Sequence, residues 1–464
     1  MTRGFRACVT APNYRRSHQI SSGKTAVVVG AGLAGLLAAA ALPDFFENVV
    51  VVERDRLPTR PELRKGVPQG PHVHTLLGYA VEAFDQLVPG MIARLYEAGA
   101  VRIRRNQDIW FHDMVGPTPI RDVGILTPSV TRPLLEHVAG DLIFRKPNVT
   151  LREGTRLVSF LSDAAHNVCG VAVNSDAGGD ETISAQLVID CSGRGSRLPS
   201  WLQQQGYDAV EAQQLDINMG YTSGTFRPPP KWRNSSWACL MLAIPPSRRA
   251  AYISPVDGGH WVATTYGRGG EFAPRDLEGF LEWTRGLAHP VVHDRLAEAE
   301  LVGQLRSYNI PTGIWRRYDR MERFPDGVLP AGEGFTSFNP MYGQGISLAA
   351  GQALALRAAL KQRAPSDGDP LTGLALAYFA GCFELNAQAW SVMETRDLAF
   401  PSTQGPRPAD FDERWRVSHA IRRLAEVDPD IHRLSVRVLH PMEPTSALQD
   451  PKIMKRAMAL AGET

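Results

Sequence analysis

The stretch "TAVVVGAGLAGLLAAAAL", from Thr25 to Leu42, carries the most informative local pattern of the chain. It opens with a short apolar run, Thr25–Val29, of the kind that forms a buried parallel strand. Gly30, Gly32 and Gly35 follow in G-x-G-x-x-G spacing, and an Ala- and Leu-rich segment suited to a helix comes next. In such a turn the first glycine allows a sharp bend, the second lets backbone approach a pyrophosphate, and the third lets helix and strand pack closely. This pattern predicts a Rossmann-like unit.

The following apolar run, "NVVVVERD", ends in Glu53, at the spacing at which an acid hydrogen-bonds the ribose of a dinucleotide. The helix N-terminus after the glycines would present free N–H groups and a partial positive charge to phosphates. The combination indicates a dinucleotide site rather than a glycine-rich turn without a ligand. An acid in place of a base favours FAD or NAD over NADP.

Two later segments distinguish between FAD and NAD. "AQLVIDCSGRGSRLPSWL" reads as a strand ending near Asp190, followed by Ser192 and Gly193. "VLPAGEGFTSFNPMYGQGISLAAGQALALRAAL", from Val328 to Leu360, reads as a strand, two glycine turns and a helix. A simple NAD dehydrogenase needs no second glycine turn so late in the chain. A flavin does, because its ribityl chain and ring extend beyond the pyrophosphate, and FAD is therefore the expected cofactor.

These segments resemble the class A flavoprotein monooxygenases, which have the p-hydroxybenzoate hydroxylase type of fold. In that family a late Gly-Asp turn binds the ribityl chain, and a P-x-x-G-x-G loop leads into a helix aimed at the flavin ring. Glu333 stands here where the family usually has Asp, and the resemblance implies that it binds the ribityl hydroxyls. The cofactor-binding residues expected from the motifs and the resemblance are Gly30, Ala31, Gly32, Ala34, Gly35, Glu53, Arg54, Lys65, Arg132, Ser192, Gly193, Gly332, Glu333, Pro340, Gly343, Gln344, Gly345 and Ile346.

"DCSGRGSRLP" is similar to the D-x-S-G variant of flavin halogenases, prenyl reductases and certain epoxidases, although the W-x-W-x-I-P signature of halogenases is absent. Within this group the chain looks like the flavin-dependent polyene epoxidases of polyether biosynthesis. That resemblance implies that Arg132 contacts the cofactor and that a loop with Arg64, Lys65, Gln69 and His72 covers it near the ribityl chain. It rests on four blocks: "ERDRLPTRPELRKGVPQGPHVHTLL", "TRPLLEHV", "FNPMYGQGIS" and "TRDLAFPSTQGPRP".

The resemblance implies an FAD-dependent monooxygenase that transfers one oxygen atom from a flavin C4a-hydroperoxide to an alkene of a lipophilic natural-product intermediate. NAD(P)H would supply electrons, directly or through a separate flavin reductase. Because the cofactor does the difficult chemistry, no catalytic side chain is assigned. Three alternatives stay open: an aromatic hydroxylase on the same fold, an oxygen-independent prenyl or alkene reductase, and a non-catalytic flavin-binding protein.

The pattern along the chain predicts an α/β fold with an α+β insert. We expect a mobile extension over residues 1–22 and a Rossmann-like FAD-binding domain over 23–200 and 324–370. A β-rich substrate domain over 201–323 and a C-terminal helical region over 371–464 complete it. Aromatic and apolar residues of the insert are candidate substrate contacts: Tyr221, Phe226, Trp237, Met241, Trp261 and Tyr266.

Composition and motif content argue against several other classes of function. A net charge of +2 gives no global field for nucleic acid, and no nucleic-acid-binding motif is present. The five cysteines form no CxxC pair, and "HVH" (His72 and His74) lacks a third ligand, so no metal is expected. Cys191 is expected to pack near the cofactor as a small residue. With no run of about 18 apolar residues, a cytoplasmic protein without membrane contact is expected; the sequence does not set its oligomeric state.

Overall fold

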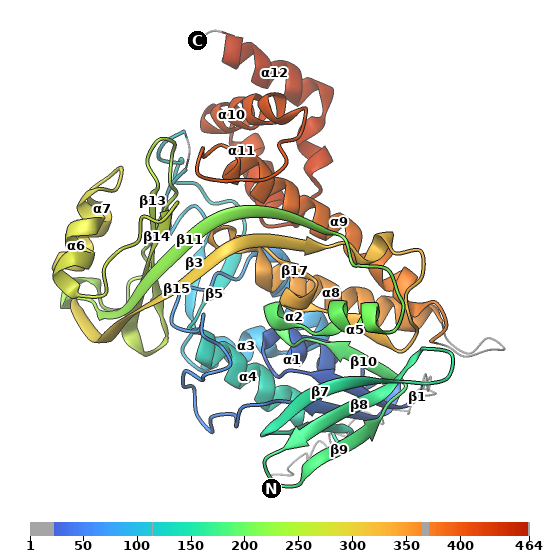
Figure 1. The fold of residues 1–464 in the computed structure, drawn as a ribbon. Helices are drawn as coiled ribbons and strands as arrows, with labels where there is room; N and C mark the ends of the chain where they lie inside the picture. The colour runs from blue at the N-terminus through green and yellow to red at the C-terminus, as the bar shows by residue number, and fades with distance from the viewer. Residues whose placement is uncertain (1–22, 114, 364–370, 463–464) are drawn as a thin grey trace, which may run out of the picture.

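The computed structural model describes residues 23–113, 115–363 and 371–462 of the chain (Figure 1). The extension expected over residues 1–22 lies outside the described residues. The predicted fold class is confirmed: a Rossmann-like sheet with helices, a β-rich region and C-terminal helices follow one another as expected.

A five-stranded parallel sheet forms the base of the molecule, in the order β16-β10-β1-β2-β6. Every pair in it is parallel, so the carboxyl ends of all five strands lie along one edge. Segments that follow β1, β10 and β16 therefore meet although they are far apart in the sequence. The strands are β1 (Gly23–Val29), β2 (Phe46–Val52), β6 (Val149–Arg152), β10 (Leu187–Asp190) and β16 (Val328–Pro330).

Helices cover this sheet because its central strands are apolar on both faces. Ala26, Val27 and Val28 of β1 are fully buried. Helix α1 packs against α8 and α4, and α2 packs against α8. The helices of this part are α1 (Leu33–Ala41), α2 (Gly78–Leu87), α3 (Met91–Glu97), α4 (Arg132–Phe144), α5 (Leu198–Gln204) and α8 (Gln344–Gln362). Two small antiparallel sheets flank it: β3 (Val101–Arg104) with β5 (Leu126–Ser129), and β7 (Thr155–Ser162), β8 (Val168–Ser175) and β9 (Gly179–Ser184).

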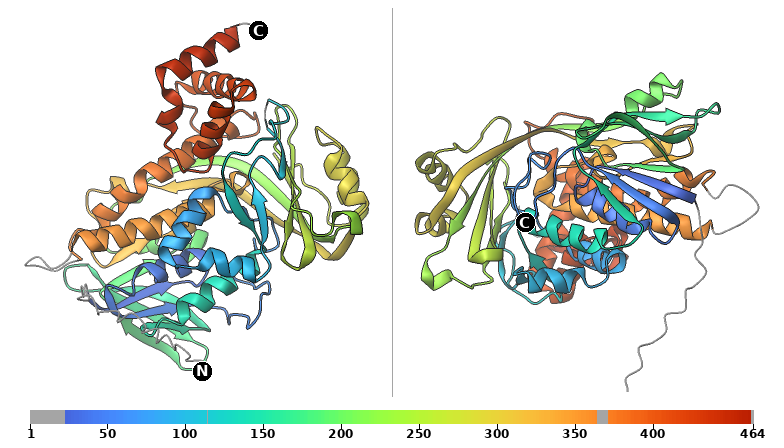
Figure 2. Two further views of the ribbon diagram at one scale, coloured as in Figure 1. Left: turned by 180° about the vertical axis from the view of Figure 1, so that it is seen from behind. Right: turned by 90° about the horizontal axis from the view of Figure 1, so that it is seen from below.

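A seven-stranded sheet, in the order β17-β15-β11-β14-β13-β12-β4, forms the β-rich region. Its long strands β11 and β15 arch from this region over the first sheet toward α9 (Figures 1 and 2). Five strands fall in the range expected for the insert, while β4 and β17 from outside that range complete the two edges. The strands are β4 (Ile109–His112), β11 (Ala212–Arg227), β12 (Ala238–Met241), β13 (Arg249–Val256), β14 (His260–Arg268), β15 (Glu300–Arg316) and β17 (Thr336–Ser337).

The two faces of this sheet carry different partners. Tyr221 pairs with Tyr266 across β11 and β14, and Phe226 pairs with Trp261. Because side chains alternate along a strand, an odd separation places these two pairs on opposite faces. The Phe226 face packs in a separate core beneath helices α6 (Leu277–Arg285) and α7 (Val291–Ala297), whereas the Tyr221 face belongs to the main core. We call the Tyr221 side the inner face and the Phe226 side the outer face.

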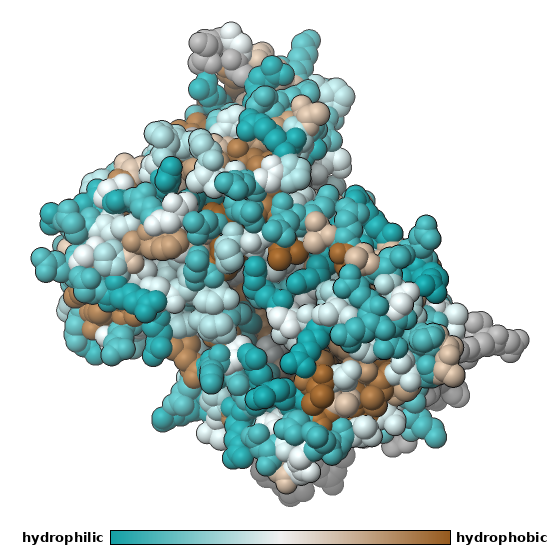
Figure 3. Space-filling model, in the orientation of Figure 1, coloured by the Kyte–Doolittle hydropathy of each residue, from teal (hydrophilic) through white to brown (hydrophobic). Residues whose placement is uncertain are grey.

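The C-terminal helices form the end of the molecule opposite the five-stranded sheet (Figure 1). They are α9 (Leu374–Asp397), α10 (Phe411–Val427), α11 (Pro429–Leu439) and α12 (Pro451–Gly462). Ala420, Leu424, Ile431 and Ala457 give α10, α11 and α12 a small core of their own, whereas α9 packs against α8 as part of the main core. Within the described part of the chain, no helix has the length and apolar character needed to cross a membrane. The face in Figure 3 is largely hydrophilic, with hydrophobic residues in small separate groups.

Candidate functional site

Three glycine turns meet at the carboxyl edge of the parallel sheet. A Cβ added to Gly30, which has φ +100°, would lie 2.7 Å from the carbonyl oxygen of Cys191. A Cβ on Gly332, which has φ +61°, would lie 2.6 Å from the Cβ of Ala34. Only glycine fits at these two positions, because the backbone conformation is left-handed and the neighbouring segment is in contact. The turns after β1, β10 and β16 therefore form one packed structure.

Helices α1 and α8 both begin without a side-chain cap. Gly32 is the N-cap of α1, and Gly343, with φ +68°, is the N-cap of α8. A Cβ added to Gly32 or to Gly345 would meet nothing within 4 Å, so both face open space. The free N–H groups and the positive end of each helix dipole favour phosphates or an electron-rich ring edge there. This arrangement fits the pyrophosphate and the ring of FAD.

Asp190, at the end of β10, fixes the second turn. Its fully buried carboxylate accepts hydrogen bonds from the N–H (3.0 Å) and hydroxyl (2.5 Å) of Ser192, and from the hydroxyl of Ser196. This holds Gly193 beside the Gly332–Gly334 turn, where a Cβ on Gly334 would lie 3.6 Å from the Gly193 carbonyl oxygen. Asp190 was not among the predicted cofactor-binding residues. The sequence feature that could have identified it is an acidic residue at the end of an apolar strand, with a serine two residues later.

Glu53 lies where the sequence placed it, at the end of β2 and beside the first turn. Its buried carboxylate accepts hydrogen bonds from the N–H groups of Ala31 (2.7 Å) and Asp55 (3.0 Å). It is thus held against the turn by backbone, and its contact with a ribose stays a prediction.

A buried cluster of charges lies next to Glu53. Arg64 lies within 3.4 Å of the carboxylates of Glu53, Asp55 and Glu136, and it donates to the carbonyl oxygen of Ala31 at 3.0 Å. Burial alone would lower the pKa of Arg64, but the three carboxylates outweigh it and raise that pKa. Arg64 therefore stays charged and braces the turn, and its place in a loop that covers the cofactor stays a prediction.

The other predicted basic residues differ in their surroundings. Arg132, the first residue of α4, donates from Nε to Glu136 at 2.7 Å and so joins the cluster. Arg54 and Lys65 are exposed, and neither has a hydrogen-bond partner among the described residues. The structure thus gives Arg132 a fixed position at the cleft, while contacts of Arg54 and Lys65 with FAD stay predictions.

Glu333 lies in the turn after β16, with Arg316 donating to its carbonyl oxygen at 3.2 Å. Solvent reaches its side chain, yet surrounding protein atoms partly desolvate the carboxylate and raise its pKa. The guanidinium groups of Arg194 and Arg132 act in the opposite direction. The carboxylate is therefore accessible in the cleft and flanked by two cations, and its contact with the ribityl chain stays a prediction.

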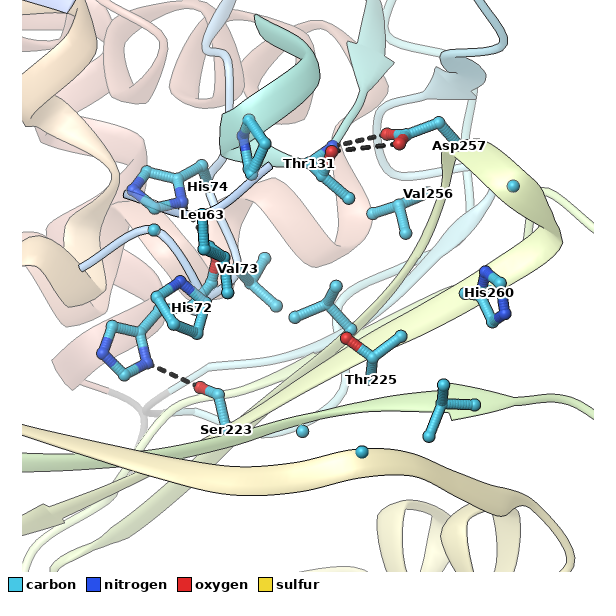
Figure 4. Close-up of a pocket in the computed structure, with 18 of the residues that line it drawn as sticks. Leu63, His72, Val73, His74, Thr131, Ser223, Thr225, Val256, Asp257 and His260 are labelled. Carbon is cyan, nitrogen blue, oxygen red and sulfur yellow. Dashed lines mark hydrogen bonds between the residues drawn. The ribbon is translucent and has the colours of Figure 1, made fainter. Parts of the chain in front are cut away.

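A cavity of about 450 Å³ lies between the inner face of the seven-stranded sheet, the loop of residues 61–74 and the N-terminus of α4 (Figure 4). At one side Thr131 donates from its N–H (2.6 Å) and hydroxyl (3.0 Å) to Asp257, which closes the wall between α4 and the turn after β13. The lining combines aliphatic and small polar side chains with three histidines, Asp257 and Arg306, and none of the described lining residues is Phe, Tyr or Trp. Apolar side chains in it are Leu63, Val73, Val130, Val256, Val262 and Val302.

His72 lies at the border of this cavity, and its Nδ1 contacts the hydroxyl of Ser223 at 2.8 Å (Figure 4). Its ring centroid is 5.6 Å from that of Tyr221 and 6.0 Å from that of Tyr308, and its buried Nε2 has no partner among the described residues. Burial lowers the pKa of His72 to about 4, so the ring is neutral near pH 7. His74 turns back, its Nδ1 lying 2.8 Å from the carbonyl oxygen of His72. The described residues contain no group of three or more potential metal ligands.

The expected substrate contacts from Met241 and Trp261 are corrected by the structure. Both are at most 1% exposed and pack with Phe226 in the outer-face core beneath α6 and α7, and Trp237 packs against that core. The sequence showed aromatic strands but not which face would meet α6 and α7, and strand alternation puts these residues on the wrong side.

Tyr221 and Tyr266 do lie on the inner face, with ring centroids 4.9 Å apart. Neither lines the 450 Å³ cavity, whereas Tyr221 lines a second cavity of about 260 Å³ together with Phe272 and Tyr308. The sequence missed the polar inner-face residues Ser223 and Thr225, which do line the larger cavity.

Comparison with known proteins identifies the class of protein. The family model of FAD-dependent oxidoreductases matches residues 26–199, which hold the first two turns described above. A protein named Rv3254 from Mycobacterium tuberculosis (strain ATCC 25618 / H37Rv) is 31% identical over 451 residues, covering 94% of this chain and 93% of its own length. The chain belongs to the FAD-dependent oxidoreductase family.

Solved structures share the fold at low identity. The flavin-dependent brominase Bmp2 has a TM-score of 0.64 at 15% identity, covering 95% of this chain and 98% of its own. PqsL from Pseudomonas aeruginosa, named as a probable FAD-dependent monooxygenase, has a TM-score of 0.62 at 18% identity, covering 82% and 96%. At such identities these likenesses describe the fold and not the reaction.

Proposed function

We propose that this protein is an FAD-dependent monooxygenase that places one oxygen atom of O₂ on an alkene of a lipophilic natural-product intermediate, giving an epoxide. The observation that carries the proposal is the 450 Å³ cavity beside His72, whose walls carry several Leu and Val side chains and, among the described residues, no Phe, Tyr or Trp. Such walls suit a flexible hydrocarbon chain, and they offer an aromatic substrate no Phe, Tyr or Trp ring to stack against.

The titratable groups near the cavity support an alkene over a phenol. A phenol hydroxylase gains from a base that draws the proton from the substrate, and an epoxidase does not need one. His72, with a pKa lowered to about 4, is a weak base whose Nδ1 is already engaged by Ser223. Burial raises the pKa of both Tyr221 and Tyr266, so both stay protonated at neutral pH.

In this proposal the protein binds, orients and shields. The first turn and the α1 N-terminus hold the pyrophosphate, Glu53 the adenosine ribose, Glu333 the ribityl chain, and the Gly343–Gly345 backbone the ring. Bound FAD supplies the activation of O₂. The hydrogen bonds of Thr131 to Asp257 close one side of the cavity, which would limit the access of water to a bound substrate. Electrons come from NAD(P)H, directly or through a separate flavin reductase.

An alkene reductase would use the same aliphatic cavity, and this alternative is separated by its independence of O₂. The test is to reduce the holoprotein photochemically and mix it with ¹⁸O₂ and a panel of linear polyenes, with p-hydroxybenzoate as the phenol control. We expect an ¹⁸O-labelled epoxide or its diol from a polyene and no product from the phenol. A hydroxylated phenol alone, or alkene reduction without oxygen, would overturn the proposal.

A further inference from the structure

A charged pair lies in the protein interior where the β-rich region, the late glycine loop and the C-terminal helices meet. Arg268, the last residue of β14, contacts Asp397, the last residue of α9, with Nη2 and Oδ1 2.8 Å apart. The arginine is 1% exposed and the aspartate 0%. The functional site described above uses neither residue.

Asp397 also holds two side chains of the loop that precedes α8. The Asn339 amide donates to both carboxylate oxygens, at 3.1 and 3.0 Å, and the Tyr342 hydroxyl donates to Oδ1 at 2.5 Å. Arg268 in turn donates to the Tyr342 hydroxyl at 3.1 Å. One carboxylate thus receives hydrogen bonds from both ends of the short Pro340–Tyr342 turn.

The same contacts fix the loop backbone. The Asn339 side-chain oxygen accepts from the N–H of Met341 at 3.1 Å and from the hydroxyl of Tyr221 at 3.2 Å. The residue after Tyr342 is Gly343, whose left-handed conformation starts α8. The position of the α8 N-terminus, which faces the cleft, therefore follows from how Asn339 and Tyr342 are held.

Stability alone does not account for this pair. Removing two charges from water costs several kcal/mol for each ion, and the loss is recovered only when every donor and acceptor is satisfied. Nε and Nη1 of Arg268 have no hydrogen-bond partner among the described residues, although the guanidinium carbon lies 4.2 Å from the Phe400 ring centroid. An incompletely satisfied pair of this kind is better explained by the geometry that it imposes.

We propose that Asp397 is a positioning residue for the cofactor: it sets the Asn339–Gly343 loop and the α8 N-terminus, and through them the affinity and reduction potential of bound FAD. The C-terminal helices would then tune the flavin without touching it. This inference rests on FAD binding, which the family establishes. Its readouts need no substrate, so failure of alkene oxidation would leave it intact.

The test compares three variants by FAD titration, visible spectrum, midpoint potential and thermal unfolding. Asp397→Asn keeps the shape and removes the charge. Asp397→Asn leaves Arg268 without its counter-charge and can prevent folding. The second variant is therefore Tyr342→Phe, which removes one hydroxyl and keeps the ion pair. The matched control is Asp113→Asn, which weakens a partly buried ion pair with Arg422 beside β4, at the edge of the seven-stranded sheet away from β17.

We expect Asp397→Asn or Tyr342→Phe to change the ratio of affinities for reduced and oxidised FAD about tenfold, equivalent to about 30 mV for a two-electron couple. The flavin absorption bands should shift with it. Asp113→Asn should lower the melting temperature and leave potential and spectrum unchanged. A folded Tyr342→Phe protein with wild-type potential, spectrum and FAD affinity would overturn the proposal. An equal change in the control would also overturn it, because general loosening would then explain the effect.

Discussion

Gly35 lies so close to Gly30 that a Cβ on Gly35 would be 1.8 Å from the Gly30 carbonyl oxygen. This contact joins α1 to the end of β1 and sets the angle at which the helix meets the cleft. Gly32, between them, has open space on its Cβ side. The two glycines thus serve different purposes, packing in one case and ligand approach in the other.

Gly35→Val and Gly32→Val should therefore fail differently. Gly35→Val forces the backbone apart and should destabilise the protein by more than about 3 kcal/mol, measured by urea unfolding. Gly32→Val should fold with little change in stability and purify without FAD, because its side chain fills the path of the pyrophosphate. Yellow, FAD-loaded Gly32→Val protein would contradict the role given to that residue.

The contact of Glu333 with the cofactor can be tested by removing its carboxylate and, separately, by shortening its side chain. Glu333→Ala should weaken FAD binding about tenfold, the cost of one lost hydrogen bond of about 1.4 kcal/mol. Glu333→Asp keeps the carboxylate between Arg194 and Arg132 and should retain most of the affinity. The measurement is fluorescence titration of the apoprotein with FAD. Identical affinity in wild type and both variants would show that the side chain does not meet the cofactor.

Because His72 is buried as a neutral ring, we expect the free energy of unfolding to fall as the pH is lowered. Its folded pKa of about 4 lies below the ordinary value of 6.5, so the unfolded chain binds the proton more readily between these values. The free energy of unfolding is therefore unaffected by this group above pH 6.5 and decreases as the pH falls toward 4. The loss from His72 alone is about 2 kcal/mol at pH 5. Urea unfolding of wild type and His72→Gln at pH 7.5 and 5.0 measures it. The wild type should lose more stability on acidification, and parallel losses would show that the ring is not buried as a neutral group.

The two faces of the seven-stranded sheet predict opposite phenotypes. Trp261→Ala leaves a hole beneath α6 and α7 and should cost about 3–5 kcal/mol in stability, with KM for an accepted polyene unchanged. Thr225→Leu fills part of the 450 Å³ cavity and should raise KM with a much smaller loss of stability. A raised KM in Trp261→Ala alone would restore the outer face as a substrate wall.

The sequence could predict those parts of the molecule whose backbone shape is determined by a few neighbouring residues. Glycine spacing, the acid of Glu53 and the late loop around Gly343 define backbone shapes within a few residues, and these yielded the fold class and the FAD assignment. Asp190 gave a weaker local signal, an acid followed by small residues, whose meaning needs the partner turn at Gly332.

The rest depends on contacts between segments that no local pattern joins. Which face of β14 meets a helix decides whether Trp261 or Tyr266 is near the cleft, and that follows from where α6 and α7 pack. Arg268 and Asp397 read separately as ordinary charged residues. Only the folded chain brings them together around Tyr342.

Strand β17 pairs with β15 through Ile314 with Ser337 and Trp315 with Thr336, and the Asn339 loop begins directly afterwards. The sheet that borders the 450 Å³ cavity is thus joined by backbone hydrogen bonds to the segment that leads into the Asn339–Gly343 loop. Under the proposed function, a substrate that displaces this sheet on entering the cavity would also displace the loop beside the flavin, and occupancy of the cavity would change the flavin environment.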